Sequence, residues 1–431
     1  MGMKEFSLPY GKGSVSFEIP EEQVLYEIWG RDYPVVKNLE ETYKTALEHP
    51  IDAPPLSQLV KPENKIVILA ADITRTWQRN ADTLPILIET LNQLGVPDDN
   101  ITIIIAVGAH RPNTEEEFAE ICGDDVCHRI RMVNHDASDK ANMVYLGRTS
   151  RGTEVSVNRL AVETDRLIMT GGVIYHFLAG YGGGRKMILP GISSIDTIRQ
   201  NHLRWLGPNL GDGSRPECGS AVTRGNPVHE DMMDICSFVN PDFTINMVPN
   251  LDGEIAGIIA GNWVSAWLEA TKLVDHIFDC EIEEQADIVI GSAGGYPRDI
   301  NLYQTSKLMD NCYQACKDTG VSLLLSECPD INEPSEFYNW FNHPSLVEME
   351  RALRDNMTIG GLVAFKVQEY CRKKTILLTR PENAAHVAKT HLIPAYSIEE
   401  AMKLAYENCG TPNPKVTLMP QGASVLPRLK K

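Results

Sequence analysis

A glycine-rich basic segment spans residues 180–186, where the sequence reads Gly-Tyr-Gly-Gly-Gly-Arg-Lys. Glycine has no Cβ, so backbone N–H groups in such a segment can approach an anion closely and adopt dihedral angles that other residues avoid. Arg185 and Lys186 would add positive charge beside these amides. His176 and His202 bracket the segment, and this combination of amides, an amine and imidazoles predicts a site for one bound group.

Two common nucleotide-binding motifs do not fit this segment. A P-loop requires Ser or Thr after its lysine, whereas Lys186 precedes Met187. The dinucleotide pattern G-x-G-x-x-G fails as well, because its last glycine would fall on Arg185 when counted from Gly180, or on Met187 when counted from Gly182. The sequence therefore predicts an anion-binding loop of another kind; the alternative is an exposed flexible loop with solvated basic side chains.

Three short apolar segments read as buried strands, and each one runs into polar residues. They are residues 65–70, 101–107 and 166–170, all rich in β-branched side chains. Ligands of open α/β sheets bind beyond the carboxyl ends of the strands. A single histidine at such a place is more often structural, but three histidines at strand ends or beside the glycine-rich segment favour a catalytic pocket. The residues expected around this pocket are Asp72, Arg75, His110 and His176.

Strand and helix signals alternate in two series, which predicts an α/β protein made of two α/β domains. In the first series, a helix over residues 81–94 would be capped by Asn80. The predicted N-terminal domain covers residues 1–272 and the predicted C-terminal domain covers residues 285–395, with the active site in the cleft between them. Residues 396–431 could belong to either domain.

The second series contributes candidate residues on one predicted helix. Asp299 would cap this helix, and Tyr303 and Lys307, four positions apart, would share one face of it. An ordinary amphipathic helix explains the same spacing. If the helix faces the interdomain cleft, Lys307 would bind a carboxylate there.

Composition narrows the class of partner. The 431-residue chain carries a formal net charge of −18, which argues against nucleic acid or an anionic membrane surface as a partner. No apolar run approaches the length of a membrane span, and the first residues do not resemble a signal peptide. The ten cysteines lack the spacing of structural zinc sites and are expected to be free thiols. We therefore expect a cytoplasmic enzyme that acts on a small molecule.

A set of short motifs resembles the nickel-dependent lactate racemase family in order and spacing, over about residues 10–420. The motifs are Asp72-x-x-Arg75, Gly108-x-His110, His176 with the glycine-rich segment, Leu189-Pro-Gly191, Asn201-His202, Gly225-Asn-Pro-Val-His229 and Tyr303-Gln304-x-x-Lys307. Members of this family bind a nickel-pincer nucleotide, a pyridinium-3-thioamide-5-thiocarboxylic acid mononucleotide that holds Ni(II) through two sulfur atoms and a ring carbon. The resemblance implies inversion of C2 of a 2-hydroxy acid by proton-coupled hydride transfer through a 2-keto acid. It also implies that cofactor-biosynthesis enzymes load the cofactor.

The resemblance further implies a role for each site residue. Lys186 would carry the covalent link to the cofactor, and His202 would be the nickel ligand from the protein. His110 and His176 would be the acid/base pair. The residues expected to bind substrate are Arg75, Lys307 and Tyr303, and the remaining cofactor contacts would come from Asp72, Gly182, Gly183, Gly184, Arg185 and Gln304.

One segment departs from lactate-specific members, which have a tryptophan near the substrate. The corresponding residues here are 358–362, Thr-Ile-Gly-Gly-Leu, and no tryptophan follows Trp340. Because two glycines and a leucine leave more room, we expect a 2-hydroxy acid other than lactate, or a broader set of 2-hydroxy acids. The alternatives are a lactate racemase proper, a non-catalytic cofactor-binding or storage protein, and a zinc hydrolase with His110, His176 and His202 as metal ligands.

Overall fold

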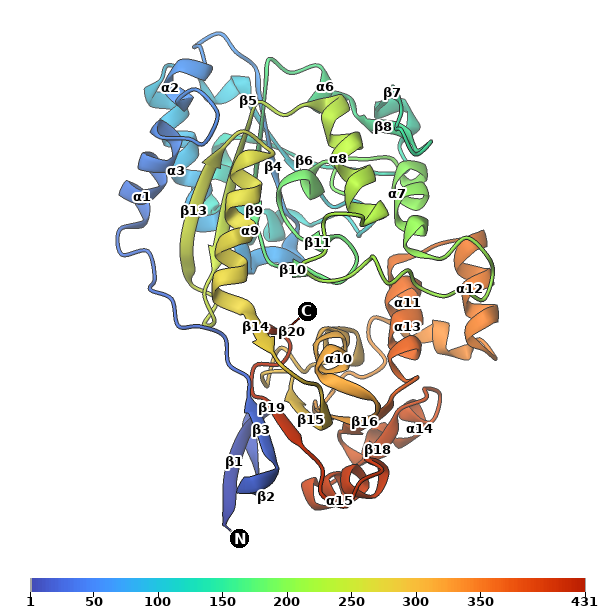
Figure 1. The fold of residues 1–431 in the computed structure, drawn as a ribbon. Coiled ribbons are helices and arrows are strands. Elements are labelled where there is room, and N and C mark those ends of the chain that lie inside the picture. Colours follow the sequence, from blue (N-terminus) through green and yellow to red (C-terminus); the bar gives the residue numbers. More distant parts are fainter. Residues whose placement is uncertain (1, 431) are drawn as a thin grey trace. The chain divides into compact units, whose positions relative to one another are not determined.

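The chain forms two compact units in the computed structural model, which describes residues 2–430 (Figure 1). The N-terminal unit contains residues 32–205 and 215–277. The C-terminal unit contains residues 206–214, together with the described residues up to 31 and from 278 onward. Both units are built from helices and parallel strands, which confirms the predicted α/β class with two domains.

The amino-terminal strands belong to the C-terminal unit, unlike the predicted domain of residues 1–272. Strand β3 (Val24–Glu27) pairs in parallel with β19 (Val416–Met419), at the edge of the C-terminal sheet. The hairpin of β1 (Met3–Tyr10) and β2 (Gly13–Pro20) places Phe6, Leu8, Phe17 and Ile19 in the core of the same unit. This assignment rests on contacts between residues almost 400 positions apart, for which the local sequence carries no signal.

Residues 206–214 are a second segment that belongs to the C-terminal unit although the chain on either side of it does not. Two carboxylates of that unit bind its backbone amides. Glu350 accepts hydrogen bonds from the amides of Gly211 (3.0 Å) and Gly213 (3.3 Å). Glu369 accepts one from the amide of Ser214 at 2.9 Å. We call this segment the strap. The chain leaves the N-terminal unit after Trp205 and returns to it at Arg215.

The N-terminal unit is organised around a six-stranded sheet of order β13-β12-β9-β4-β5-β6. The three predicted strands are confirmed and lie side by side at its centre, all parallel, so their carboxyl ends share one edge. Only the edge strand β13 runs antiparallel to its neighbour. The strands are β4 (Ile66–Ala70), β5 (Ile101–Ile105), β6 (Arg131–Asn134), β9 (Arg166–Gly172), β12 (Phe243–Pro249) and β13 (Ile255–Gly261).

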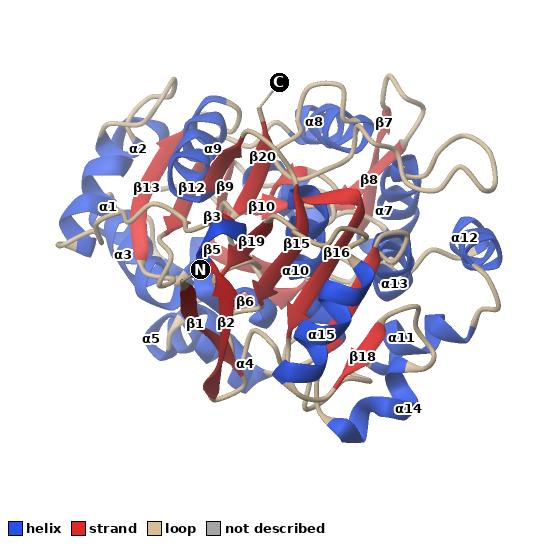
Figure 2. Cartoon of the chain, turned by 60° about the horizontal axis from the view of Figure 1, so that its bottom comes forward, coloured by secondary structure: helices blue, strands red, loops and turns tan. Residues whose placement is uncertain are grey.

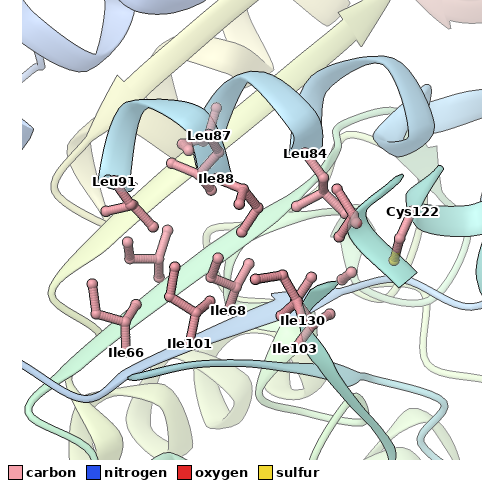
Figure 3. Close-up of a cluster of buried hydrophobic side chains, with 14 of the residues drawn as sticks. Ile66, Ile68, Leu84, Leu87, Ile88, Leu91, Ile101, Ile103, Cys122 and Ile130 are labelled. Carbon is pink, nitrogen blue, oxygen red and sulfur yellow. The ribbon is translucent and has the colours of Figure 1, made fainter. Parts of the chain in front are cut away.

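Helix α3 (Asn80–Gln93) shows how the core of this unit is built. Its apolar side chains recur every three to four positions, at Leu84, Leu87, Ile88 and Leu91, and point onto the isoleucines of β4 and β5 (Figure 3). Burying each such side chain contributes about 1.5–3 kcal/mol. The helix includes Asn80 as its first residue, so the predicted cap is one position off; Arg79, at a positive φ of 59°, precedes it.

The other elements of the N-terminal unit lie around this sheet or form small ribbons. The helices are α1 (Leu39–Glu48), α2 (Leu56–Leu59), α4 (Glu115–Cys122), α5 (Asp124–Arg129), α6 (Arg159–Val162), α7 (Ile195–His202), α8 (Pro227–Val239) and α9 (Ser265–Phe278). The ribbons are β7 (Met143–Arg148) with β8 (Glu154–Asn158), and β10 (Tyr175–His176) with β11 (Gly180–Tyr181).

The C-terminal unit has its own six-stranded sheet, of order β18-β17-β16-β15-β19-β3, and every pair in it is parallel. The new strands are β15 (Ala286–Ser292), β16 (Cys316–Leu325), β17 (Lys374–Leu378) and β18 (Ile393–Ala395), with a separate pair of β14 (Asp279–Ile282) and β20 (Leu426–Leu429). The helices are α10 (Leu302–Ala315), α11 (Ser335–Tyr338), α12 (Leu346–Asp355), α13 (Ile359–Tyr370), α14 (Ala384–Val387) and α15 (Ile398–Asn408). Figure 2 shows α15 beside β16, against which it packs.

The cap of helix α10 differs from the prediction. Asn301 is the N-cap, and its side chain accepts a hydrogen bond from the amide of Gln304 at 2.9 Å. Asp299 is fully buried instead, where it accepts hydrogen bonds from the amides of Gly11 (2.6 Å) and Glu327 (3.3 Å). Asp299 therefore joins two loops rather than starting the helix.

Two further findings concern the chain as described. All ten cysteines are free thiols, as expected. Among residues 2–430, no helix combines the length and the apolar character needed to cross a membrane.

Candidate active site

Asp72 and His110 meet at the carboxyl edge of the N-terminal sheet. Asp72 follows β4 and caps a 3-10 turn, accepting a hydrogen bond from the amide of Thr74 at 2.9 Å. His110 follows β5, and its Nδ1 lies 2.6 Å from Asp72 Oδ2. Because a carboxylate only accepts, the neutral form of His110 carries its proton on Nδ1 and a lone pair on Nε2. His110 is thus oriented as a base.

The Asp72 carboxylate stays ionised in this setting. Its side chain is 6% exposed, and burial alone would raise its pKa. The hydrogen bonds from His110 and Thr74 and the nearby Arg75 guanidinium outweigh burial and hold the pKa of Asp72 below its ordinary value. The prediction that β4 and β5 bring these residues together is confirmed as a matter of geometry.

His176 and Lys186 form a second contact, on the ribbon and on the glycine-rich loop. Nε2 of His176 lies 2.7 Å from Nζ of Lys186. Nδ1 of His176 accepts hydrogen bonds from the amides of Leu178 (3.2 Å) and Ala179 (3.3 Å). The neutral ring therefore carries its proton on Nε2, the opposite arrangement from His110.

The surroundings of Lys186 favour its uncharged amine form. Burial is the main reason that its pKa falls well below the ordinary value, and the positive charges of Arg75 and Arg185 lower it further. Burial is also the main reason that the pKa of His176 lies well below its ordinary value. With both groups neutral, the lone pair of the amine can accept the Nε2–H of His176, and the nitrogen remains a nucleophile.

Arg185 lies differently from the prediction that it would contact a ligand. Its guanidinium is fully buried and donates to the carbonyl oxygens of Ala179 (2.7 Å), Gly182 (3.3 Å) and Gly183 (3.4 Å). It also lies over the ring of Trp267, 4.0 Å from the centroid. Burial lowers its pKa to about 9, so it remains protonated at neutral pH. Arg185 holds the loop together from inside.

The glycines of the loop are required by packing. Gly183 has a φ of 64°, and a Cβ there would lie 2.8 Å from the carbonyl oxygen of Gly172. Gly184 has a φ of 50°, and its Cβ would lie 2.6 Å from Cδ1 of Trp267. At Gly182, in contrast, the nearest atom would be 3.6 Å away. The sequence suggested that these glycines let the backbone approach a bound anion. At Gly183 and Gly184 the backbone instead lies close to other parts of the protein, and only Gly182 has free space beside it.

Replacing Gly184 with Ala is expected to destabilise the N-terminal unit by about 1–3 kcal/mol, because the new methyl group meets the Trp267 ring and the φ is unfavourable for alanine. Urea unfolding measures the effect. Gly182→Ala is the matched control, since it has room for the methyl group, and it should change stability by less than half as much. Equal effects of the two substitutions would contradict this account.

His202 ends helix α7 and is 3% exposed. Its Nδ1 is buried and makes no hydrogen bond of good geometry. The carbonyl of Ile198, one turn earlier, raises the pKa of His202, but burial lowers it by more. Burial is the main reason that the pKa of His202 falls to about 3. A neutral buried imidazole of this kind has the protonation state that a metal ligand needs.

The three histidines do not form one ligand group. His110 contacts Asp72 and His176 contacts Lys186, as described above. Among residues 2–430, no group of three or more His, Cys, Asp or Glu side chains is arranged to hold a metal ion. The zinc hydrolase alternative requires all three histidines as ligands of one metal ion, and they are not grouped in that way in the described residues.

The remaining predicted residues lie on α10, in the C-terminal unit. Nζ of Lys307 donates to Oε1 of Gln304 at 3.0 Å, and the ring of Tyr303 contacts that of Phe337 edge-on, with centroids 5.3 Å apart. The three predicted residues thus share one helix.

Sequence reasoning missed two residues that support the loop. Trp267 on α9 donates from Nε1 to the carbonyl of Gly182 at 2.9 Å. His229 on α8 stacks on Trp267 and accepts a hydrogen bond from Arg185 at 3.0 Å. The sequence analysis included His229 in one of the family motifs but assigned it no role. Trp267 lies in an ordinary amphipathic helix, and nothing in the local sequence marks it as a contact of the loop.

Comparison with known proteins identifies the family of this chain. The sequence profile of the lactate racemase N-terminal domain matches residues 10–213, and that of the lactate racemase C-terminal domain matches residues 282–427. The chain belongs to the lactate racemase family. Members of the family are isomerases, and this chain is therefore an isomerase of the racemase type.

Similar proteins within the family cover the whole chain. Lactate racemase of Thermoanaerobacterium thermosaccharolyticum is 32% identical over 99% of this chain and 100% of its own, and the enzyme of Lactiplantibacillus plantarum is 29% identical over 98% and 100%. The solved lactate racemase apoprotein from T. thermosaccharolyticum superposes with a TM-score of 0.89 at 32% identity, covering 99% of this chain and 100% of that one. A Thermotoga maritima protein of 18% identity, with a TM-score of 0.66, shares the fold.

Proposed function

We propose that this member of the lactate racemase family inverts C2 of 2-hydroxy acids by hydride transfer, with a nickel-pincer nucleotide as cofactor. The observation that carries the proposal is the pair of histidines with opposite proton positions. His110 presents a bare Nε2 and His176 a protonated one. Two imidazoles held in this way suit a reaction in which a hydroxyl proton leaves on one side of the substrate and returns on the other.

The residues of the N-terminal unit fit such a cofactor. Lys186 offers an uncharged amine for a covalent link, and no carboxylate is among its hydrogen-bond partners in the described structure. His202 offers a neutral, buried imidazole nitrogen, which suits nickel. When bound, the cofactor would supply an electrophilic centre for the C2 hydride of the substrate.

The chemistry explains why the protein residues are imidazoles and cations. Taking the C2 hydrogen as a proton would leave a carbanion beside a carboxylate, whereas removing it as hydride leaves a neutral keto group. His110 would then accept the hydroxyl proton at Nε2 while Asp72 stabilises the charged ring. Arg75 is the cation in this unit that would bind the substrate carboxylate, and the partnership of Arg75 with Lys307 in that role stays a prediction.

The two glycines of residues 358–362 have other side chains packed against them. A Cβ at Gly361 would lie 2.2 Å from Cε2 of Trp340, and a Cβ at Gly360 would lie 1.8 Å from Oε2 of Glu336. These two side chains therefore fill the space that the glycines leave. Oε1 of Glu336 accepts a hydrogen bond from Nε1 of Trp340 at 3.1 Å, which joins the two.

This arrangement refines the proposed substrate. With residues 358–362 beside the substrate, as the family resemblance implies, the Glu336 carboxylate would repel a second carboxylate on the substrate and accept hydrogen bonds from hydroxyl groups. We therefore favour 2-hydroxy acids with polar, uncharged substituents over dicarboxylic ones.

A direct test is to produce the protein together with the cofactor-synthesis enzymes, measure its intact mass and nickel content, and assay a substrate panel. We expect a covalent adduct, bound nickel, and racemisation of an aldonate faster than of lactate, malate or 2-hydroxyglutarate. A marked preference for lactate would contradict the substrate proposal. A protein that carries the adduct but turns over none of these acids would support the storage alternative.

Arg75→Lys is expected to lower kcat/KM for a 2-hydroxy acid by about 5- to 150-fold, equivalent to 1–3 kcal/mol for a charged hydrogen bond, because lysine cannot grip a carboxylate with two parallel N–H groups. The corresponding 2-hydroxy amide should react slowly with the wild type and respond little to the substitution. Racemisation rates for both compounds measure this difference. Equal sensitivity of acid and amide would show that Arg75 serves the fold or the cofactor.

A further inference from the structure

Asp231 on α8 is a fully buried carboxylate with an unusual set of donors. Its Oδ1 accepts a hydrogen bond from Thr149 Oγ1 at 2.7 Å, and its Oδ2 accepts one from Thr153 Oγ1 at 2.8 Å. Both threonines lie at the turn between β7 and β8. Oδ2 also accepts a hydrogen bond from Asn201 Nδ2 at 2.9 Å and lies 3.1 Å from Arg204 Nε.

The last two donors come from the residues around His202. Asn201 directly precedes His202, and Arg204 follows it by two positions, so one carboxylate holds the chain on both sides of this histidine. Arg204 is bound further by its Nη2, which donates to Thr153 Oγ1 (2.7 Å) and to the carbonyl of Arg151 (2.6 Å). The final turn of α7 is thereby fastened both to α8 and to the β7–β8 turn.

The imidazole of His202 has no comparable restraint of its own. Its Nδ1 makes no hydrogen bond of good geometry, as described above, so the placement of this side chain depends on how firmly the end of α7 is held. Helix ends fray when their last turn is not held. A metal ligand must be placed to within a fraction of an ångström, and the groups behind it commonly provide that accuracy.

We propose that Asp231 is a positioning residue for His202, which sets the direction of this imidazole toward the bound nickel. The inference rests on the proposed role of His202 as nickel ligand. Asp231 does not touch the cofactor or the substrate in this account. It acts through Asn201 and Arg204. The negative charge of the buried Asp231 also balances the positive charge of Arg204.

The test uses holoenzyme produced with the cofactor-synthesis enzymes and measures how fast nickel passes to a chelator. The variants are Asp231→Ala, which removes all four contacts, and Asp231→Asn, which keeps an acceptor. Asp242→Ala is the matched control, because Asp242 also ties together segments of the N-terminal unit, through the Leu167 amide (2.9 Å) and Arg166 (3.2 Å) at the start of β9. All proteins are compared at a temperature where circular dichroism shows each to be folded.

Asp231→Ala should release nickel on the order of 10-fold faster than both the wild type and Asp242→Ala, and Asp231→Asn should fall in between. The visible absorption band of the bound nickel should shift in the Asp231 variants and stay unchanged in Asp242→Ala. A purely structural role would lower the stability of both sets without moving the band. Equal release rates and identical bands would overturn the proposal.

A milder variant covers the case in which Asp231→Ala does not fold. Asn201→Leu removes the link from Asp231 to Asn201, together with the hydrogen bond from Asn201 to the Val228 carbonyl (3.1 Å), and keeps the Asp231–Arg204 pair. It should release nickel several-fold faster than the wild type. An unchanged rate would overturn the proposal. A wild-type protein that binds no nickel contradicts the proposed function itself, whereas nickel-bound wild type with unaffected variants contradicts only the role of Asp231.

Discussion

Replacing His110 with Ala is expected to lower kcat for racemisation by about 10²- to 10⁴-fold, while the nickel content and the covalent adduct stay as in the wild type. The variant loses the base that takes the hydroxyl proton, but His110 contacts neither Lys186 nor His202 through any hydrogen bond in the described structure. Chiral analysis of the product gives the rate, and metal analysis with intact mass gives the loading.

Asp72→Asn provides the companion to this variant. The amide can donate to Nδ1 of His110, which moves the ring proton to Nε2 and removes the lone pair that the reaction needs. We expect a loss of kcat of about 10²-fold or more with the fold unchanged. A different outcome would contradict the assigned roles: His110→Ala losing nickel as readily as His202→Ala would make His110 a ligand rather than a base.

Replacing Lys186 with Arg is expected to abolish the covalent adduct. A guanidinium stays protonated and is a poor nucleophile, whereas burial lowers the pKa of the Lys186 amine and so favours its uncharged, nucleophilic form. The intact mass of denatured protein should match the unmodified chain, and racemisation should fall to the background rate. Lys140→Arg, at an exposed 3-10 turn, is the control and should carry the full adduct. An adduct that persists in Lys186→Arg would place the link on another residue.

The parts of the fold that could be predicted are those that local sequence determines. Strands β4, β5 and β9 are continuous apolar runs because both faces of a central parallel sheet are covered, and their polar ends mark the edge where Asp72 and His110 meet. Helix α4 likewise begins at a local signal, because Thr114 caps it and Glu117, three positions later, completes the capping box. In each case the signal and the structure it predicts lie within a few residues of each other.

The parts that could not be predicted depend on distant partners. Arg185 looked like a ligand-binding cation because its sequence neighbours are glycines, and only the folded chain shows Trp267 and three carbonyl groups around it. The strap was predicted to lie in the first domain but belongs to the C-terminal unit, because Glu350 and Glu369, 139 and 155 positions after their partners, accept hydrogen bonds from its amides. A tryptophan was missing from residues 358–362, yet Trp340 from another segment packs against Gly361.

The inward carbonyls around Arg185 have a directional consequence for the loop. A trans peptide unit is planar, with its N–H pointing opposite to its C=O. The carbonyls of Ala179, Gly182 and Gly183 are drawn toward the guanidinium, so the amides of Gly180, Gly183 and Gly184 are turned the other way. Arg185 thus fixes the orientation of these three peptide planes from inside the loop, so that their directions are set by the fold before any ligand binds.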